Sequence, residues 1–515
     1  MAEPLTNNQR IAKNTIMLYI RMLLSVVVSL YTSRVVLEVL GVEDYGLYGL
    51  VGGVVSMFSF LNSTMAGATS RFLTFEMGKG DQERIRATFS SALLIHIGIA
   101  LIVSLLAETI GLWFMSNKLV IPEGRMVAAK FVYQCSVISS IIAITQVPYN
   151  SLIIAHERMN VYAYVEILNV TLKLLIVYFL RIGNFDKLKL YGFFVLFVSI
   201  LIMLIYRIYC IRNFPESRFI LIWNKDILKP MLSFSGWDLY GNICMTTRHQ
   251  GTNILINHFF GVIANASVSI ATTVSGVIEG FTGSMITAFR PRIIKSYSQN
   301  DWVQMQSMLN NAIKFSTLFL IMLVIPILLE THFFINIWLG DVPKYLVSFI
   351  RILLIINSFG TINLVVRTGI QATGNIKRLS FYTGTIYLLT IPTSFLFLKL
   401  GFEAYIVYIV NLCSNILILS LNLWILKKQV KNVSVLSILS VILRVYTIGI
   451  LTALPLILLS ININSGLLRV LLISLFDIIV LSLLTYVIVL NKAQREFVKN
   501  RLKKIYYKVG KLFYK

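Results

Sequence analysis

Residues 467–490 read LLRVLLISLFDIIVLSLLTYVIVL, and the charged side chains in this run are Arg469 and Asp477. A membrane-spanning α-helix needs about 20 consecutive, mostly apolar residues, and this run meets that length. The strands of an outer-membrane barrel instead alternate apolar and polar residues over about 10 positions. The unbroken run therefore predicts a transmembrane helix and argues against a β-barrel.

Similar apolar runs recur along the chain, which has 515 residues, 57% of them hydrophobic and 13% charged. Soluble domains carry about 25% charged residues. This composition excludes a soluble enzyme, a disordered chain and a fibrous repeat. We predict an all-α polytopic membrane protein with about 14 transmembrane helices. The expected spans lie near 13–38, 45–70, 87–115, 126–150, 161–181, 190–211, 230–258, 262–288, 305–330, 346–370, 379–399, 403–426, 436–460 and 467–490.

The chain is strongly basic, with 46 Lys and Arg against 22 Asp and Glu and a net charge of +24. If the N-terminus is inside, the expected inner loops hold most of the loop Lys and Arg, and the expected outer loops are short. Cytoplasmic loops of membrane proteins show this excess. We therefore expect both termini in the cytoplasm and no nucleic-acid partner.

The longest internal connection lies between two Pro residues and divides the first twelve expected helices into two groups of six. The tail carries basic residues and, at helical spacing, apolar ones, which predicts an amphipathic helix on the cytoplasmic membrane surface. The expected units are an N-terminal lobe (1–212), a cytoplasmic link (213–229), a C-terminal lobe (230–430), two extra helices (431–490) and the tail (491–515).

The two groups of helices share a weak pattern at a constant offset, at which Gly41 falls on Gly261 and Asp81 falls on Asp301. Parallel repeats of this kind build two-lobed transporters with a central site at the lobe interface. Convergent helix composition is the alternative explanation of the pattern.

Ionisable residues inside a bilayer are costly and usually face a cavity or a partner. The polar run 246–253, TTRHQGTN, interrupts an expected span and predicts a hydrated cavity. Guanidinium groups form bidentate hydrogen bonds with phosphate oxygens, so an Arg-rich, acid-poor cavity favours an anionic, phosphate-bearing substrate. The predicted substrate-binding residues are Arg21, Arg34, Lys173, Arg248, Arg351 and Arg367.

Some of these residues have a structural alternative. Arg34 lies one helical turn from Glu38, so the two can form an ion pair. Arg351 and Arg367, like Arg290, can extend their side chains to the membrane interface.

Asp238 and His249 are the candidates for ion coupling. Asp238 shares an expected helix with Arg248, and a His titrates near physiological pH. A polar His that faces another helix is the alternative for His249. The five His are scattered and no Walker-type phosphate loop occurs, so we predict no metal site, no cofactor and no catalytic residue.

Several short segments resemble one known family. They are 10–15 (RIAKNT), 40–48 (LGVEDYGLY), 148–158 (PYNSLIIAHER) and 369–375 (GIQATGN). In combination they resemble the polysaccharide (O-antigen type) flippases of the multidrug/oligosaccharidyl-lipid/polysaccharide exporter superfamily. The resemblance implies two six-helix lobes in a V, two additional C-terminal helices and a cationic cavity for pyrophosphate.

The resemblance and the Arg-rich cavity together predict a flippase, not an enzyme, in the bacterial inner (plasma) membrane. It would carry an undecaprenyl-pyrophosphate-linked oligosaccharide outward for O-antigen, capsule or exopolysaccharide assembly. Expected partners are this substrate, membrane lipids, and a polysaccharide polymerase with its chain-length machinery. The alternatives are a drug/cation antiporter of the same superfamily and a membrane-embedded polysaccharide polymerase or glycosyltransferase.

Overall fold

The computed structural model describes residues 7–56, 60–117, 121, 124–180, 185–220, 224–340, 342–430, 432–490, 494–496 and 499. Every regular element in these ranges is helical, which confirms the predicted all-α fold. Most of the expected tail helix lies outside the described residues.

The helices follow one another with short connections. Within the described ranges, ten helical stretches are long and apolar enough to cross a membrane, so the protein is a multi-pass membrane protein. The total of about 14 spans remains a prediction. The helices are α1 (Asn7–Ser56), α2 (Phe60–Lys79), α3 (Gln82–Leu106), η1 (Ala107–Gly111), α4 (Leu112–Asn117), α5 (Met126–Ala155), α6 (Met159–Phe179), α7 (Lys187–Asn213), η2 (Pro215–Ser217), α8 (Lys225–Ser298), α9 (Trp302–Leu329), α10 (Thr331–Leu339), α11 (Leu346–Ala372), α12 (Lys377–Lys399), α13 (Ile406–Gln429), α14 (Val435–Asn462), α15 (Leu467–Leu484) and η3 (Thr485–Val489).

Two of these helices, α1 and α8, contain a sharp bend at a glycine. Gly41 has φ 80° and ψ 167°, and Gly261 has φ 76° and ψ −173°. Both conformations are open to glycine and strained for other residues, because a Cβ would clash with the backbone. The two bends occupy the positions that the sequence pattern aligns with each other.

Asp81 and Asp301, which the same sequence pattern aligns, each precede the first residue of a helix. The Asp81 side chain accepts hydrogen bonds from the backbone N–H groups of Glu83 and Arg84 at the start of α3. Asp301 accepts one from the N–H of Gln304 at the start of α9. Each carboxylate satisfies N–H groups that have no partner within the helix.

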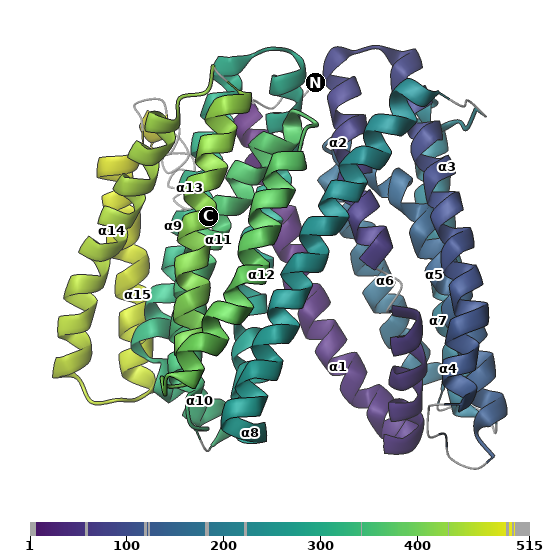
Figure 1. Ribbon diagram of the computed structural model, residues 1–515, viewed down its shortest axis with the longest axis horizontal. Helices are drawn as coiled ribbons and strands as arrows, with labels where there is room; N and C mark the ends of the chain where they lie inside the picture. The colour runs from purple at the N-terminus through teal and green to yellow at the C-terminus, as the bar shows by residue number, and fades with distance from the viewer. Residues whose placement is uncertain are drawn as a thin grey trace, which may run out of the picture.

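The helices form two bundles with an additional helix pair at one side (Figure 1). The first bundle contains α1–α7 and the second contains α8–α13, while α14 and α15 pack on α9. In Figure 1, α1 and the first half of α8 run diagonally across the molecule and lean in opposite directions. We call the end at which α1 begins and α2 ends the Lys79 end, and the end with the two glycine bends the Gly41 end.

The diagonal course takes the first part of each of these helices towards the other bundle. On α1, the Tyr19 ring stacks on Phe319 of α9, with 5.0 Å between ring centroids. On α8, the Phe234 ring packs edge-on against Phe72 of α2 at 6.0 Å. Phe72 and Phe234 belong to a hydrophobic core that contains residues of both bundles.

Charged groups hold the bundles together at the Lys79 end. The Glu157 carboxylate, just beyond α5, forms ion pairs with Arg292 at 2.8 Å and Lys295 at 3.4 Å, both on α8. The buried Arg71 of α2 donates hydrogen bonds to the carbonyl oxygens of Gln371 and Ala372 at 3.2 and 2.6 Å. A cation at this position also complements the negative end of the α11 dipole.

The connection between the bundles is docked on the first one. The His156 ring stacks on Phe214 with 4.0 Å between centroids, and its Nε2 lies 2.5 Å from Glu216 Oε1. Burial by itself raises the pKa of Glu216, but the hydrogen bond and charge interaction with His156 outweigh that effect, so the pKa lies below its ordinary value.

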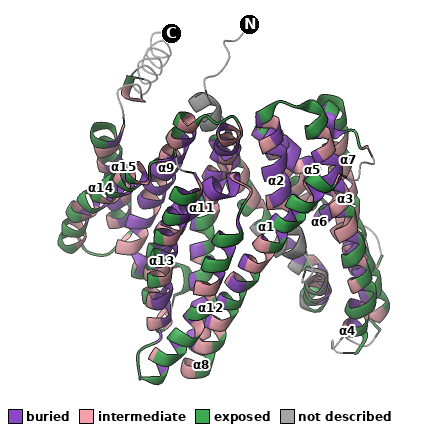
Figure 2. Cartoon of the chain, turned by 45° about the horizontal axis from the view of Figure 1, so that its top comes forward, coloured by how far each residue is buried: buried purple, intermediate pink, exposed green. Residues whose placement is uncertain are grey.

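Large apolar side chains cover the outward faces of the helices. Figure 2 shows exposed residues along α12, α13 and α14, with buried residues gathered between helices. On α14 and α15, Leu443 is 67% exposed and Leu471 is 59% exposed. Such surfaces are unfavourable in water and are normal where lipid covers a helix.

The glycine bends yield a stability prediction. Gly261→Ala should lower the free energy of unfolding by about 1–3 kcal/mol, because a Cβ is strained at this backbone conformation although the space around it is open. Gly236→Ala is the matched control, since Gly236 lies in regular helix with equally open space. Thermal unfolding of both purified variants in detergent measures the difference. Equal stability of the two would contradict the prediction.

Candidate functional site

A cavity of about 510 Å³ lies between the two bundles. We call it the lobe-interface cavity. It is lined from the first bundle by α2, α5 and α6 and from the second by α8 and α11. The lining residues are Ala66, Gly67, Ser70, Val147, Asn150, Ser151, Ile154, Tyr162, Asp238, Asn242, Gly283, Ile286, Thr287, Arg290, Leu364, Arg367, Thr368 and Gln371.

Among the described residues, those that line this cavity and carry a charge are two arginines and one aspartate. Arg367 Nη2 lies 2.5 Å from Asp238 Oδ1, and Asn242 Nδ2 donates to Asp238 Oδ2 at 3.2 Å. Arg290 Nη2 donates to Gln371 Oε1 at 3.2 Å. One carboxylate thus faces two guanidinium groups, and the balance in the cavity is positive.

Part of the donor capacity of these arginines is unused. The Nε atoms of both Arg290 and Arg367 are buried and have no hydrogen-bond partner among the described residues. A buried donor without a partner is unfavourable, and a guanidinium prefers an anionic oxygen. The cavity can therefore accept an anionic group from a substrate.

A second cavity, of about 590 Å³, lies inside the second bundle. We call it the second-bundle cavity. Its lining side chains come from α8, α11, α12 and α13 and are rich in Asn, Thr and Tyr. Leu364 and Arg367 line both cavities, so the two adjoin at the Arg367–Asp238 pair.

Four of the predicted site residues lie on these cavities. Arg367 and Asp238 line the lobe-interface cavity. Arg248 and His249, from the polar run on α8, line the second-bundle cavity, with Arg248 Nη2 3.4 Å from His249 Nε2. The predicted ion-coupling residue Asp238 holds a guanidinium in this structure.

The other predicted residues lie elsewhere. The Arg21 guanidinium lies 5.1 Å from the ring of Tyr162, which lines the lobe-interface cavity. Lys173 is on α6 and lines neither cavity. Arg351 is exposed at the start of α11, where its Nε donates to Thr331. The Arg34 side chain lies outside the described part of the structure.

Arg290 lines the lobe-interface cavity but is absent from the substrate-binding residues predicted from the sequence. It lies near the end of an expected span, next to Pro291, which is why extension to the membrane interface was a reasonable expectation. The structure instead turns its guanidinium towards Gln371 inside the cavity. The sequence did contain an indication of this role. At the offset of the repeat, Arg71 aligns with Pro291, the residue that follows Arg290.

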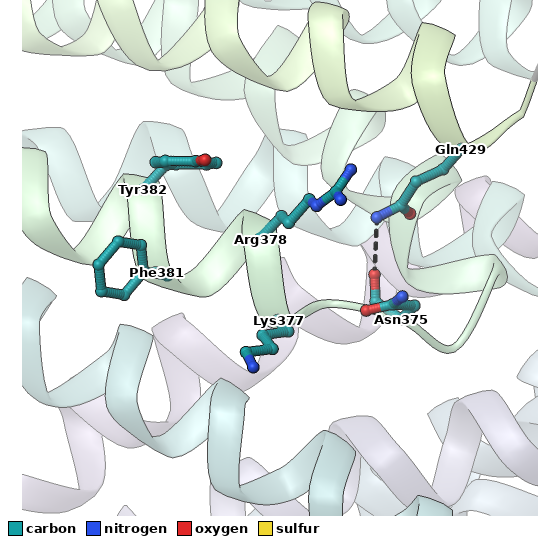
Figure 3. A pocket seen from close by; sticks show the side chains of 6 residues that line it. All are labelled: Asn375, Lys377, Arg378, Phe381, Tyr382 and Gln429. Atoms are coloured by element: carbon teal, nitrogen blue, oxygen red, sulfur yellow. Dashed lines mark hydrogen bonds between the residues drawn. The ribbon is translucent and has the colours of Figure 1, made fainter.

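A third cavity, of about 490 Å³, lies at the start of α12 (Figure 3). It is lined by Lys377 and Arg378 together with Phe381 and Tyr382. The Gln429 side chain closes one side by donating to the Asn375 carbonyl at 3.0 Å. None of its lining residues lines the lobe-interface cavity or the second-bundle cavity, so it is separate from both.

The chain matches the model of a known protein family. The model of a family described as "Polysaccharide biosynthesis protein" matches residues 36–348. A curated relative, the uncharacterized membrane protein EpsK of Bacillus subtilis (strain 168), is 20% identical over 331 residues, which is 62% of this chain. The match spans 63% of the length of that relative.

Solved structures show the same fold. MATE in the bent conformation matches with a TM-score of 0.71 at 14% identity, covering 86% of this chain and 96% of that one. A MOP superfamily transporter from Pyrococcus furiosus, described as having reverse polarity of its binding pocket, matches with a TM-score of 0.68 at 14% identity and the same coverage. The family resemblance inferred from the sequence is thereby confirmed. The chain belongs to the family of polysaccharide biosynthesis proteins, and it shares the fold of the solved MATE and MOP superfamily structures.

Proposed function

We propose that this transporter flips a lipid-linked oligosaccharide, carried on undecaprenyl pyrophosphate, from the inner to the outer leaflet of a bacterial inner membrane. The observation that carries the proposal is the lobe-interface cavity, where Arg290 and Arg367 face one carboxylate, Asp238. The family match supports a role in polysaccharide biosynthesis.

The pyrophosphate is the part of such a substrate that most needs protein contacts inside the membrane. Its oxygens accept hydrogen bonds and carry negative charge, and the unpartnered Nε donors of Arg290 and Arg367 complement both. Arg is better suited than Lys because its planar guanidinium can donate two parallel hydrogen bonds. The prenyl chain would remain in lipid while the head group crosses.

The arrangement of the bundles supports alternating access. Both bundles line the cavity, and the Glu157 ion pairs and the Arg71 hydrogen bonds join them at the Lys79 end. We propose that this end is cytoplasmic, as the distribution of basic loops indicates. The structure then represents a state held closed towards the cytoplasm, and rocking of the bundles would reverse the access.

The membrane potential would assist outward movement of this substrate. An inside-negative potential favours outward transfer of an anion by about 2.3 kcal/mol per charge and 100 mV. A bound ion is therefore not required to drive the anionic head group outward.

The nearest alternative is a drug/cation antiporter, since solved neighbours are described as MATE transporters. A cation would be favoured by carboxylates in excess of basic groups. The lobe-interface cavity has the opposite balance, and its one carboxylate already holds Arg367. This charge balance favours the flippase.

The function is tested directly in a bacterium that carries this gene. Deletion should cause the undecaprenyl-linked oligosaccharide to accumulate on the cytoplasmic side, and the intact gene should reverse this. Extraction and chromatography of lipid-linked sugars measure it. Unchanged lipid-linked sugars, together with increased sensitivity to cationic drugs, would instead establish the antiporter.

Removing either cavity arginine should impair export. Arg290→Gln and Arg367→Gln should each lower surface polysaccharide by about tenfold or more, because a charge-assisted donor to the phosphate is lost. The corresponding Lys variants should restore part of the export, since Lys keeps the charge without the planar donor pair. Polysaccharide is measured at equal protein abundance in membranes.

Arg212→Gln is the matched control, because Arg212 is exposed in the last turn of α7, outside both interior cavities. It should export normally. Normal export by both Arg290→Gln and Arg367→Gln would remove the basis of the proposal.

Ion coupling through Asp238 is a separate proposal with its own test. Asp238→Asn should abolish any dependence of transport on a Na⁺ or proton gradient, because the carboxylate that could exchange Arg367 for a cation is gone. Transport by reconstituted vesicles with and without each gradient measures this. A gradient dependence equal to that of the unmodified protein would assign Asp238 to positioning Arg367 alone.

A further inference from the structure

The second-bundle cavity contains a fixed network of amide side chains. Asn422 Nδ2 donates to Asn363 Oδ1 at 3.1 Å, and Asn363 Nδ2 donates to the backbone carbonyl oxygen of Asn415 at 3.1 Å. Asn415 Nδ2 in turn donates to the backbone carbonyl oxygen of Asn411 at 2.9 Å. The network joins α11 to α13 and holds the side chains of Asn363, Asn415 and Asn422 in defined orientations.

The network leaves hydrogen-bond acceptors unused. Asn411 Oδ1 and Asn422 Oδ1 have no partner among the described residues, although Asn411 is 8% exposed and Asn422 is 2% exposed. The Tyr408 hydroxyl, 3% exposed, has no partner in the described part of the chain either. Buried polar atoms are nearly always hydrogen-bonded, so three such groups lining one cavity indicate a ligand.

Unused donors line the same cavity. Arg248 is 8% exposed, and neither its Nε nor its Nη1 has a hydrogen-bond partner within the described residues. Its guanidinium lies 4.5 Å from the ring centroid of Tyr387, which holds the group in place through a cation–π contact. Glu279 also lines the cavity, so the charge of Arg248 is balanced nearby.

The mixture of unused donors and acceptors identifies the class of ligand. Phosphate oxygens accept hydrogen bonds and cannot satisfy Asn411 Oδ1 or Asn422 Oδ1. A metal cation would satisfy those oxygens and not the N–H groups of Arg248. A sugar hydroxyl both donates and accepts, and two tyrosine rings offer apolar surface for the faces of a sugar ring.

We propose that the second-bundle cavity is a binding subsite for an uncharged sugar residue. The inference rests on the proposed function and refines it. The pyrophosphate would occupy the lobe-interface cavity, and a sugar close to it in the chain would enter the adjoining cavity past Arg367, which lines both.

The subsite also has room for a ligand. Gly276 and Gly360 line it, and a Cβ added at either glycine would meet no atom within 4 Å. A larger side chain at either position would therefore project into free space and occupy the volume assigned to the sugar.

Binding of free sugars to the purified full chain tests the proposal without requiring transport. The probes are methyl β-glucoside, methyl β-galactoside and methyl N-acetyl-β-glucosaminide. Their binding to the protein in detergent is measured by saturation-transfer NMR. At least one glycoside should give a signal that falls about tenfold in Asn411→Leu, in Asn422→Leu and in Arg248→Gln, since each variant removes a buried polar partner. Gly360→Leu should abolish it by filling the cavity.

The matched control is Asn213→Leu, which removes an amide from the exposed end of α7, outside both interior cavities, and should leave the glycoside signal unchanged. Thermal unfolding confirms that each variant is folded. The subsite is ruled out if no glycoside gives a signal with the unmodified protein, or if the signal survives Gly360→Leu and all three polar variants; the cavity would then hold water alone.

Failure of this inference differs from failure of the proposed function. If the deletion strain accumulates lipid-linked oligosaccharide and no glycoside binds, the flippase stands and the sugar subsite is wrong. If glycosides bind and no lipid-linked oligosaccharide accumulates, the chain recognises sugars without flipping this substrate.

Discussion

A guanidinium inside a membrane requires a counter-charge, a carbonyl oxygen or a polar cavity, and this requirement determines how α2, α8 and α11 meet. Arg71 satisfies it with the last carbonyls of α11, Arg367 with Asp238, and Arg290 with Gln371. Each of these contacts joins segments that are far apart in the sequence. Arg290 and Arg367, which would serve a substrate, thus also join α8 to α11, while Arg71 joins α2 to α11.

The two interior cavities differ in chemistry although they adjoin. The lobe-interface cavity has an excess of positive charge and draws its lining from both bundles, so it must change shape when the bundles move. The second-bundle cavity is built within one bundle from amides, hydroxyls and aromatic rings, and its charged lining residues include both Arg248 and Glu279. Separating charge recognition from hydroxyl recognition would allow related proteins to alter one specificity without altering the other.

The fold class could be predicted from sequence because apolar runs of spanning length are a local property. Gly41 and Gly261 could likewise be matched from the repeat pattern, and both bend their helices. The polar run around Arg248 indicated a cavity because it interrupts an otherwise apolar helix. The ion pairs between distant segments could not be predicted, because nothing local in the sequence connects Asp238 to Arg367. Arg290 was missed for a related reason: a cation near the end of a span looks the same whether it faces lipid headgroups or a cavity.

The diagonal course of α1 has a consequence for how the protein is made. This helix is synthesised before the second bundle, but the ring partners of Tyr19 are Phe281 on α8 and Phe319 on α9, the first two helices of that bundle. Until α8 and α9 have been translated and inserted, the first part of α1 has none of its final neighbours from the second bundle. The packing of the first helix is therefore completed only after the second bundle has begun to insert, and a ribosome that stalls before α8 leaves α1 packed on the first bundle alone.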